Sequence, residues 1–221
     1  MDEMSEDGGD FVAGLAATLT PVRARRPGAE AALLALLGAA QLVGFAWILR
    51  TVPFEASGGI DLSATVAKAA ALGLGAAAMS ALALASLSPG ARDARGPALL
   101  AAGLVLAALL AGLDWSAAQP AMPGKEGTLV APRDGVRCFT SALTLGLPVA
   151  LALMAFARSA APTRPALTGA LIGAAGGLWG GFVYAAQCPY VSVLYVTLWY
   201  GLAALTGAVA GRRLLGPRLR W

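Results

Sequence analysis

Two cysteines, Cys138 and Cys188, are the residues whose side chains point most directly to chemistry. A pair of thiols can form a disulfide where the fold brings the two Cα atoms within about 7 Å. The same pair can bind a thiophilic metal ion through soft sulfur ligands. The chain contains no histidine, so a closed four-ligand zinc site is not expected. A simpler alternative is that both residues are small buried apolar side chains.

The residues beside each cysteine differ in character. Arg137 precedes Cys138, and a neighbouring cation favours the thiolate; we therefore expect Cys138 to be the more reactive thiol. Cys188 lies in a short uncharged joint, QCP at 187–189, between two apolar runs. No general base, phosphate-binding glycine loop or acidic pair accompanies either cysteine. The sequence therefore predicts neither an enzyme nor a cofactor site.

The composition shows which elements must carry these residues. Of 221 residues, 58% are hydrophobic and only 13% are charged, and the mean hydropathy is +0.71. Soluble chains carry about 25% charged residues. The sequence therefore predicts an all-α, polytopic membrane protein whose partner is the lipid bilayer. The basic excess lies beside the apolar runs and does not indicate direct binding of nucleic acid.

Six apolar runs are close to the roughly 20 residues that a helix needs to cross a bilayer. The predicted spans are 29–49, 62–87, 97–113, 139–157, 165–186 and 191–210. They form a predicted transmembrane domain at 29–215, preceded by a cytoplasmic segment at 1–28 and followed by a basic tail at 216–221. Lys68 lies about two turns into the second run, and we expect its side chain to extend to the outer surface.

The distribution of Lys and Arg predicts the orientation of these spans. Eleven of the 16 basic residues lie in the N-terminal segment, 88–96, 158–164 and the C-terminal tail. Both termini are therefore predicted to be cytoplasmic. Cys138 then precedes the fourth span and Cys188 follows the fifth, so both lie at the outer face and at similar depth. An oxidising compartment outside the membrane would permit a disulfide there.

Small residues are regularly spaced in the fifth predicted span. A glycine recurs every fourth residue, at Gly169, Gly173, Gly177 and Gly181. A ridge of this kind allows the backbone of another helix to approach closely. We interpret the four glycines as helix-packing residues.

An apolar stripe marks the N-terminal segment, with Phe11, Val12, Leu15 and Leu19 at helical spacing after an acidic head. A short amphipathic helix ahead of a span can lie flat on the membrane, but the acidic head favours docking into a groove of a basic partner. We therefore predict that these four residues bind a protein.

Six motifs are distributed along the chain: FVAGLAATLTPV at 11–22, RCFTSALTLGLPVALAL at 137–153, PTRP at 162–165, QCP at 187–189, WYG at 199–201 and GRR at 211–213. Together they resemble the NrsF-type six-span anti-sigma factors. The resemblance implies a protein of the bacterial inner membrane that sequesters an extracytoplasmic-function sigma factor through its N-terminal segment. It also implies that Cys138 and Cys188 sense heavy-metal or oxidative stress and release the sigma factor, with a thiophilic metal ion as one inducer.

One residue departs from that family pattern. Members often have histidine before the second cysteine, where this chain has Gln187, a poor metal ligand, so a His-Cys metal unit is not expected. Two other functions are compatible with a polytopic chain. A transporter or channel for a metal or small solute is disfavoured by the scarcity of ionisable groups within the spans. A membrane thiol oxidoreductase is disfavoured because the chain has no C-x-x-C motif.

Overall fold

The computed structural model describes residues 26–51, 62–87, 132–160, 162–188, 190 and 193–219, together with Gly14 and Ala17. Within these residues every regular element is a helix, which confirms the predicted all-α class. The long helices are α2 (Pro27–Thr51), α3 (Leu62–Ala85), α5 (Pro132–Arg158), α6 (Pro165–Tyr184) and α7 (Val193–Ala210). The chain then continues as the π-helix η1 (Gly211–Leu215) and the 3-10 helix η2 (Pro217–Leu219).

Four of the described helices are long and apolar enough to cross a membrane. Their apolar segments are Gly28–Ile48, Thr65–Ala85, Pro132–Arg158 and Pro165–Tyr184, which coincide with the first, second, fourth and fifth predicted spans. Helix α7 covers most of the sixth predicted span with 18 residues. The third, at 97–113, lies outside the described residues. The count of six spans and the N-in/C-in orientation therefore stay predictions.

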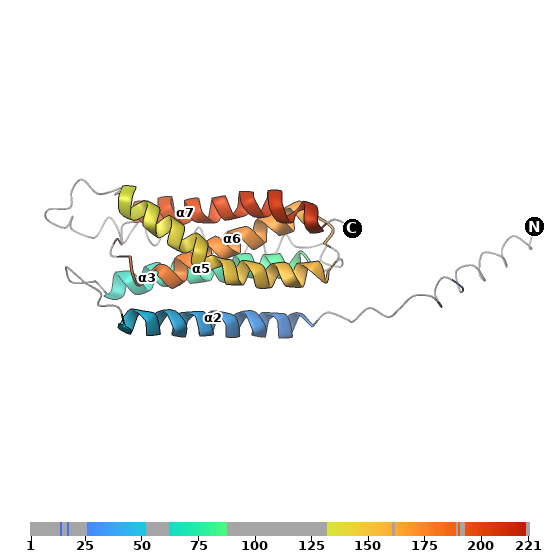
Figure 1. Ribbon diagram of the computed structural model, residues 1–221, viewed down its shortest axis with the longest axis horizontal. Coiled ribbons are helices and arrows are strands. Elements are labelled where there is room, and N and C mark those ends of the chain that lie inside the picture. Colours follow the sequence, from blue (N-terminus) through green and yellow to red (C-terminus); the bar gives the residue numbers. More distant parts are fainter. Residues whose placement is uncertain are drawn as a thin grey trace, which may run out of the picture.

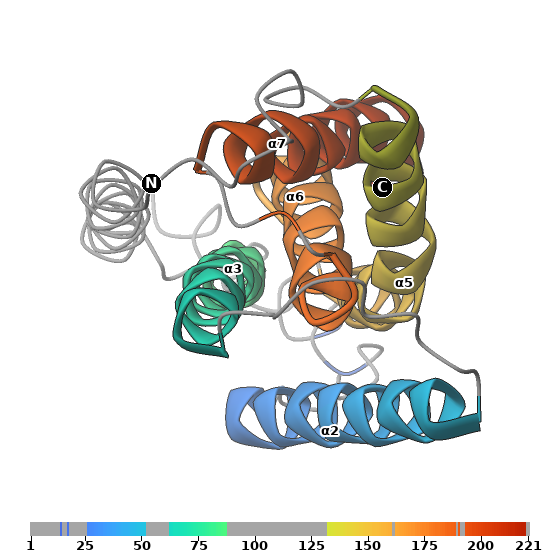
Figure 2. The same ribbon diagram turned by 90° about the vertical axis from the view of Figure 1, so that its left-hand side faces the viewer.

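Helix α6 occupies the centre of the bundle, with α3, α5 and α7 packed around it (Figure 2). The glycines at every fourth position place α6 directly against α7 and η1. A Cβ atom on Gly173 would overlap the carbonyl of Gly207, and one on Gly177 would lie 2.7 Å from the Ala203 carbonyl oxygen. The absence of side chains at these positions is thus what permits the close approach of the two backbones.

A second pair of glycines on α6 faces a different helix. A Cβ atom on Gly180 would overlap the carbonyl of Ala142, and one on Gly176 would lie 3.1 Å from that of Gly146. Helix α5 therefore packs on α6 as closely as α7 does. Two glycine faces on one helix explain how α6 can contact two neighbours at backbone distance.

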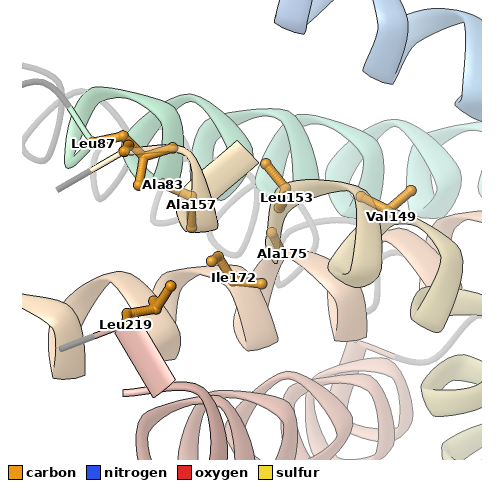
Figure 3. Close-up of a cluster of buried hydrophobic side chains, with 9 residues drawn as sticks. Ala83, Leu87, Val149, Leu153, Ala157, Ile172, Ala175 and Leu219 are labelled. Carbon is orange, nitrogen blue, oxygen red and sulfur yellow. The ribbon is translucent and has the colours of Figure 1, made fainter. Parts of the chain in front are cut away.

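Two buried clusters fill the bundle at its opposite ends. One cluster joins α3, α5, α6 and η2 through side chains that include Leu87, Leu153, Ile172 and Leu219 (Figure 3). The other surrounds Cys138 and Cys188 and includes Tyr195 and Tyr200 of α7. Leu219 belongs to the predicted basic tail at 216–221, so part of that tail packs against the bundle rather than extending from it.

Helix α2 lies at one side of the bundle in both views (Figures 1 and 2). Its large apolar side chains are mostly exposed, for example Leu36 at 67% and Trp47 at 71%, as expected of a surface that lipid covers. The side-chain amide of Gln41 bonds it to the rest of the protein. Gln41 donates to the carbonyl of Leu145 on α5, and the indole N–H of Trp179 on α6 donates to Gln41 over 3.0 Å.

The helices begin and end in a pattern that separates two ends of the molecule. Figure 1 shows the start of α2 and the end of α7 at one end of the bundle. The starts of α3 and α5 lie at the other end, which also holds Cys138 and Cys188. The thiol pair and the start of α2 are therefore separated by the length of a helix.

Candidate functional site

The two cysteine sulfurs are in contact. The Sγ atoms of Cys138 and Cys188 lie 3.4 Å apart, and the thiol of Cys138 donates to the sulfur of Cys188. Both residues are free thiols and both are buried, with 4% and 3% of their surface exposed. The sequence placed them at one face and at similar depth, and the structure brings them together. A bond between the two sulfurs needs only a shift of about 1.4 Å from the present separation to a disulfide length near 2.0 Å.

Each cysteine is positioned by the packing of a different helix. Cys138 lies on the buried face of α5, which continues at helical spacing through Ala142, Gly146 and Val149. Cys188 follows the end of α6, where a turn is closed by the N–H of Gln187 donating to the carbonyl of Tyr184 over 2.9 Å. Because α5 and α6 pack at backbone distance through glycines, the second turn of α5 lies against this joint.

Three tyrosines from the joint and from α7 surround the pair. The hydroxyl of Tyr195 lies 3.4 Å from the sulfur of Cys138, and the ring of Tyr190 stacks on that of Tyr195 with centroids 4.4 Å apart. Tyr190 donates its hydroxyl to the carboxylate of Asp134. This hydrogen bond and partial burial raise the pKa of Tyr190 to about 12, so its hydroxyl stays protonated near neutral pH. The hydroxyl of Tyr200 is buried without a hydrogen-bond partner among the described residues.

Lys68 of α3 is the cation at this site. Its side chain is buried, with 7% of its surface exposed. The ammonium group donates to the carbonyl oxygens of Cys188, over 2.6 Å, and Tyr190, over 3.1 Å. The expectation that Lys68 extends to the outer surface was therefore wrong. The side chain does reach toward that end of the bundle, but its charge is stabilised by backbone carbonyls in the joint between α6 and α7.

The surroundings favour ionisation of the Cys188 thiol. Cys188 lies in the joint outside the helices, and its pKa is lowered first by the hydrogen bond from Cys138 and also by the charge of Lys68, while burial opposes the shift. The sequence suggested Cys138 because Arg137 is its neighbour. In the folded protein the cation that contacts Cys188 is Lys68, which lies 120 positions earlier in the chain.

The donor set limits what this site could bind. Among the described residues, no group of three or more His, Cys, Asp or Glu side chains gathers where it could hold a metal ion. Two adjacent sulfurs can still serve as two soft ligands. An apolar groove of about 340 Å³ lies elsewhere, between α5, α6, α7 and η1, and is lined by residues such as Leu147, Met154, Gly173 and Leu214. It offers no ionisable side chain.

The remaining predicted functional residues have separate locations. The glycine stripe faces α7 and η1, as described above. Phe11, Val12, Leu15 and Leu19 of the N-terminal segment lie outside the described residues. Sequence reasoning did not assign Lys68 or the tyrosines to the cysteine site. An intramembrane lysine was the one visible signal for this site, whereas the tyrosines carried none because aromatic residues near span ends are common.

These observations define a helical protein with helices long and apolar enough to cross a membrane and a buried pair of unbonded cysteines at one end. A family model described as "Negative regulator of sigma F" (NrsF) matches residues 15–221, and the chain belongs to this family. Proteins of this family are anti-sigma factors, which are regulatory rather than catalytic. Family membership confirms the resemblance that the sequence motifs indicated.

Two relatives carry the family name NrsF. The chain is 35% identical over 77 residues to a probable anti-sigma-F factor NrsF of Azospira oryzae. This alignment covers 35% of this chain and 36% of that protein. The chain is also 40% identical over 89 residues to the anti-sigma-F factor NrsF of Caulobacter vibrioides. This second alignment covers 38% of this chain and 39% of that protein. The aligned segments thus span less than half of either relative. No solved structure matches the chain.

Proposed function

We propose that this protein sequesters an extracytoplasmic-function sigma factor at the bacterial inner membrane and releases it when the thiol pair is modified. Residues 1–28 bind the sigma factor, with Phe11, Val12, Leu15 and Leu19 as the apolar contacts. The stress is oxidative or is caused by a heavy metal, and Cys138 and Cys188 sense it. Family membership supports the anti-sigma role, and the 3.4 Å contact between the two sulfurs is the observation that carries the sensing role.

Contact between the sulfurs suits them to act as one chemical unit. An oxidant that removes two electrons and two protons from the pair forms one S–S bond. A thiophilic metal ion that displaces both thiol protons can be held by the same two soft sulfurs. A disulfide shortens the separation of the sulfurs to about 2.0 Å, whereas a metal ion between them, at about 2.3 Å from each sulfur as for zinc, lengthens it beyond the present 3.4 Å. Both kinds of stress therefore change the spacing between the joint after α6 and helix α5, in opposite directions.

The two ends of the bundle have different roles in this proposal. The thiol pair lies near the start of α5, at the end of the bundle away from the start of α2, and residues 1–28 lead into α2 in the chain. A displacement of α5 or α6 must therefore pass along the helices to affect the docking segment. Gly173 and Gly177 hold α6 against α7, and Gln41 connects α2 to α5 and α6. These contacts are the elements through which the proposed signal would act.

Co-purification of the sigma factor with the full-length protein from detergent-solubilised membranes tests this function. We expect the sigma factor to be retained by the untreated protein and released by diamide or Cd²⁺. Cys138→Ser and Cys188→Ser should each retain the sigma factor under both treatments, and the double variant should behave like either single one because the two thiols form one unit. Release from the double variant would show that these cysteines are not the sensor. Failure of any sigma factor to co-purify would contradict sequestration itself.

A further inference from the structure

Lys68 has an unusual position for a charged residue. It lies in the apolar segment of α3, Thr65–Ala85, and is buried rather than exposed to a polar surface. An ionisable side chain within a membrane span is costly unless polar groups stabilise it. The two hydrogen bonds to the carbonyls of Cys188 and Tyr190 supply that stabilisation.

The two carbonyls that Lys68 binds belong to the joint between two helices. Helix α6 ends at Tyr184 and α7 begins at Val193, so Cys188 and Tyr190 lie outside both helices. Hydrogen bonds to buried carbonyls contribute to the stability of a fold. Lys68 donates to both carbonyls with one ammonium, and both belong to the short stretch that carries the Cys188 sulfur.

The site is assembled from three separate segments. Cys138 belongs to α5, Cys188 follows α6, and Lys68 belongs to α3, which packs against α6. The contact between the sulfurs therefore depends on where the joint lies relative to its neighbours. The Lys68 ammonium is a direct hydrogen-bonded tie between α3 and this joint.

We propose that Lys68 is a positioning residue of the thiol pair, because its ammonium ties the Cys188 joint to α3 and holds the Cys188 sulfur against Cys138. This inference deepens the proposed sensing function. It concerns how readily the two sulfurs combine with each other, which can be measured without any sigma factor. Loss of the hydrogen bonds from Lys68 would leave both thiols present. It would lower the effective concentration of the Cys188 sulfur at the Cys138 sulfur.

Equilibration of the purified full-length protein with reduced and oxidised glutathione measures that effective concentration. One protein thiolate attacks glutathione disulfide and releases one glutathione. The second protein sulfur then displaces the other glutathione, so that two electrons pass to glutathione disulfide and two glutathione thiols form. The fraction of disulfide-bonded protein at each glutathione ratio is read from free-thiol labelling after acid quenching.

Lys68→Met keeps the length of the side chain without its N–H donors. We expect it to lower the equilibrium constant for disulfide formation by about tenfold or more, since small misplacements of reacting groups have effects of this size; tenfold corresponds to about 30 mV in reduction potential. Lys68→Arg retains donors at the end of the side chain and should restore most of the difference. Ser86→Ala removes an interhelical hydrogen bond to Thr168 beyond the far end of α3 and should leave the constant unchanged.

Three results would overturn the inference. They are an unchanged constant in Lys68→Met, an equal loss in Lys68→Met and Lys68→Arg, and a comparable loss in Ser86→Ala, which would indicate general loosening. If Lys68→Met does not fold, Lys68→Ala replaces it, since α3 is rich in alanine and the smaller side chain creates no overlap. Sigma-factor retention by the untreated variants is a separate readout, so failure of the positioning role and failure of the anti-sigma role are distinguishable.

Discussion

At the scale of single residues, the hydrogen bond between the two thiols makes them unequal. Cys138 donates its proton toward Cys188, and a thiolate that accepts a hydrogen bond is stabilised relative to the thiol. Lys68 adds a positive charge on the same side of the pair. The asymmetry therefore comes from two partners on different helices, and neither is adjacent to Cys188 in the chain.

This asymmetry predicts a shift in the pH dependence of Cys188 alkylation. Cys138→Ser keeps a hydroxyl donor, whereas Cys138→Ala keeps none, and Cys188 is the single thiol in both variants. Because a donor to the thiolate lowers the pKa of Cys188, losing it should move the alkylation profile toward higher pH. Iodoacetamide rates measured between pH 5 and 10 would show the shift in Cys138→Ala relative to Cys138→Ser. Superimposable profiles would mean that the thiol donor does not affect Cys188.

The residue scale also shows what the sequence could and could not predict about the site. The positions of the basic residues placed both cysteines at one face, because span order alone fixes which joints share a surface. The sequence could not show that Lys68 binds the joint of Cys188, since that contact depends on how α3 packs beside α6. Local sequence pointed to Arg137 beside Cys138, whereas the cation that binds the joint of Cys188 is Lys68, which is distant in the chain and adjacent in space.

At the scale of the helices, α6 determines how closely its neighbours approach. Glycine periodicity predicted that α6 packs closely, but it did not reveal which helices it contacts. The structure shows one face against α7 and η1, and a second face, at Gly176 and Gly180, against α5. The second face has only two glycines and could not be distinguished from chance by spacing alone.

Substitutions at glycines with and without close neighbours should have different effects on stability. A Cβ atom on Gly173 would overlap the carbonyl of Gly207, whereas one on Gly201 would meet nothing within 4 Å. Gly173→Ala should therefore force α6 and α7 apart and destabilise the protein by about 1–3 kcal/mol. Gly201→Ala should be neutral or slightly stabilising. Denaturation in SDS titrations, followed by circular dichroism, compares the two, and equal midpoints would contradict backbone contact between α6 and α7.

Helix α2 depends on a polar contact in an otherwise apolar setting. Gln41 donates its side-chain N–H to the carbonyl of Leu145 on α5. This carbonyl lies one turn before Pro148, which has no N–H to donate within the helix. Lipid gives no hydrophobic driving force for one helix to associate with another. The Gln41 amide therefore holds the helix that follows the predicted docking segment against the helix that carries Cys138.

Gln41→Leu should loosen this attachment without altering the thiol pair. The change leaves the Leu145 carbonyl and the Trp179 N–H without their partner, and interhelical hydrogen bonds in membranes contribute about 0.6–1.7 kcal/mol. We expect the free energy of unfolding to fall by that order, seen as a lower midpoint of the SDS titration. The glutathione equilibrium at the cysteines should be unchanged. Leu36→Ala on the exposed face of α2 is the matched control and should leave the midpoint unchanged. If both variants behave alike, Gln41 does not hold α2.

At the scale of the whole molecule, the structure separates the thiol pair from the start of α2 by the length of the bundle. The start of α2 and the end of α7 lie together at the other end (Figure 1). The placement of both termini on one side of the membrane stays a prediction. Sequence reasoning could derive the arrangement because it follows from the order of spans, whereas packing details required three-dimensional contacts.

The proposed docking segment supplies the final prediction. Residues 1–28 lead into α2, whose start lies at the end of the bundle away from the cysteines, so changes there should affect sigma-factor binding and leave the thiol site intact. Leu15→Asp combined with Leu19→Asp places two charges on the predicted apolar stripe, and burying them would cost at least a few kcal/mol. We expect the double variant to lose co-purification of the sigma factor, while the glutathione equilibrium of Cys138 and Cys188 stays at its wild-type value.

A change on the acidic side of the segment provides the control for that experiment. Asp2→Asn combined with Glu3→Gln removes two charges ahead of the stripe and should weaken binding to a basic partner only modestly, in a salt-dependent manner. A sigma factor that binds the Leu15 and Leu19 variant as tightly as the wild type would show that the stripe is not the docking surface. A changed glutathione equilibrium at Cys138 and Cys188 in the Leu15→Asp, Leu19→Asp variant would instead show that residues 1–28 support the fold. The equilibrium constant of the thiol pair changes only if the helix bundle itself changes.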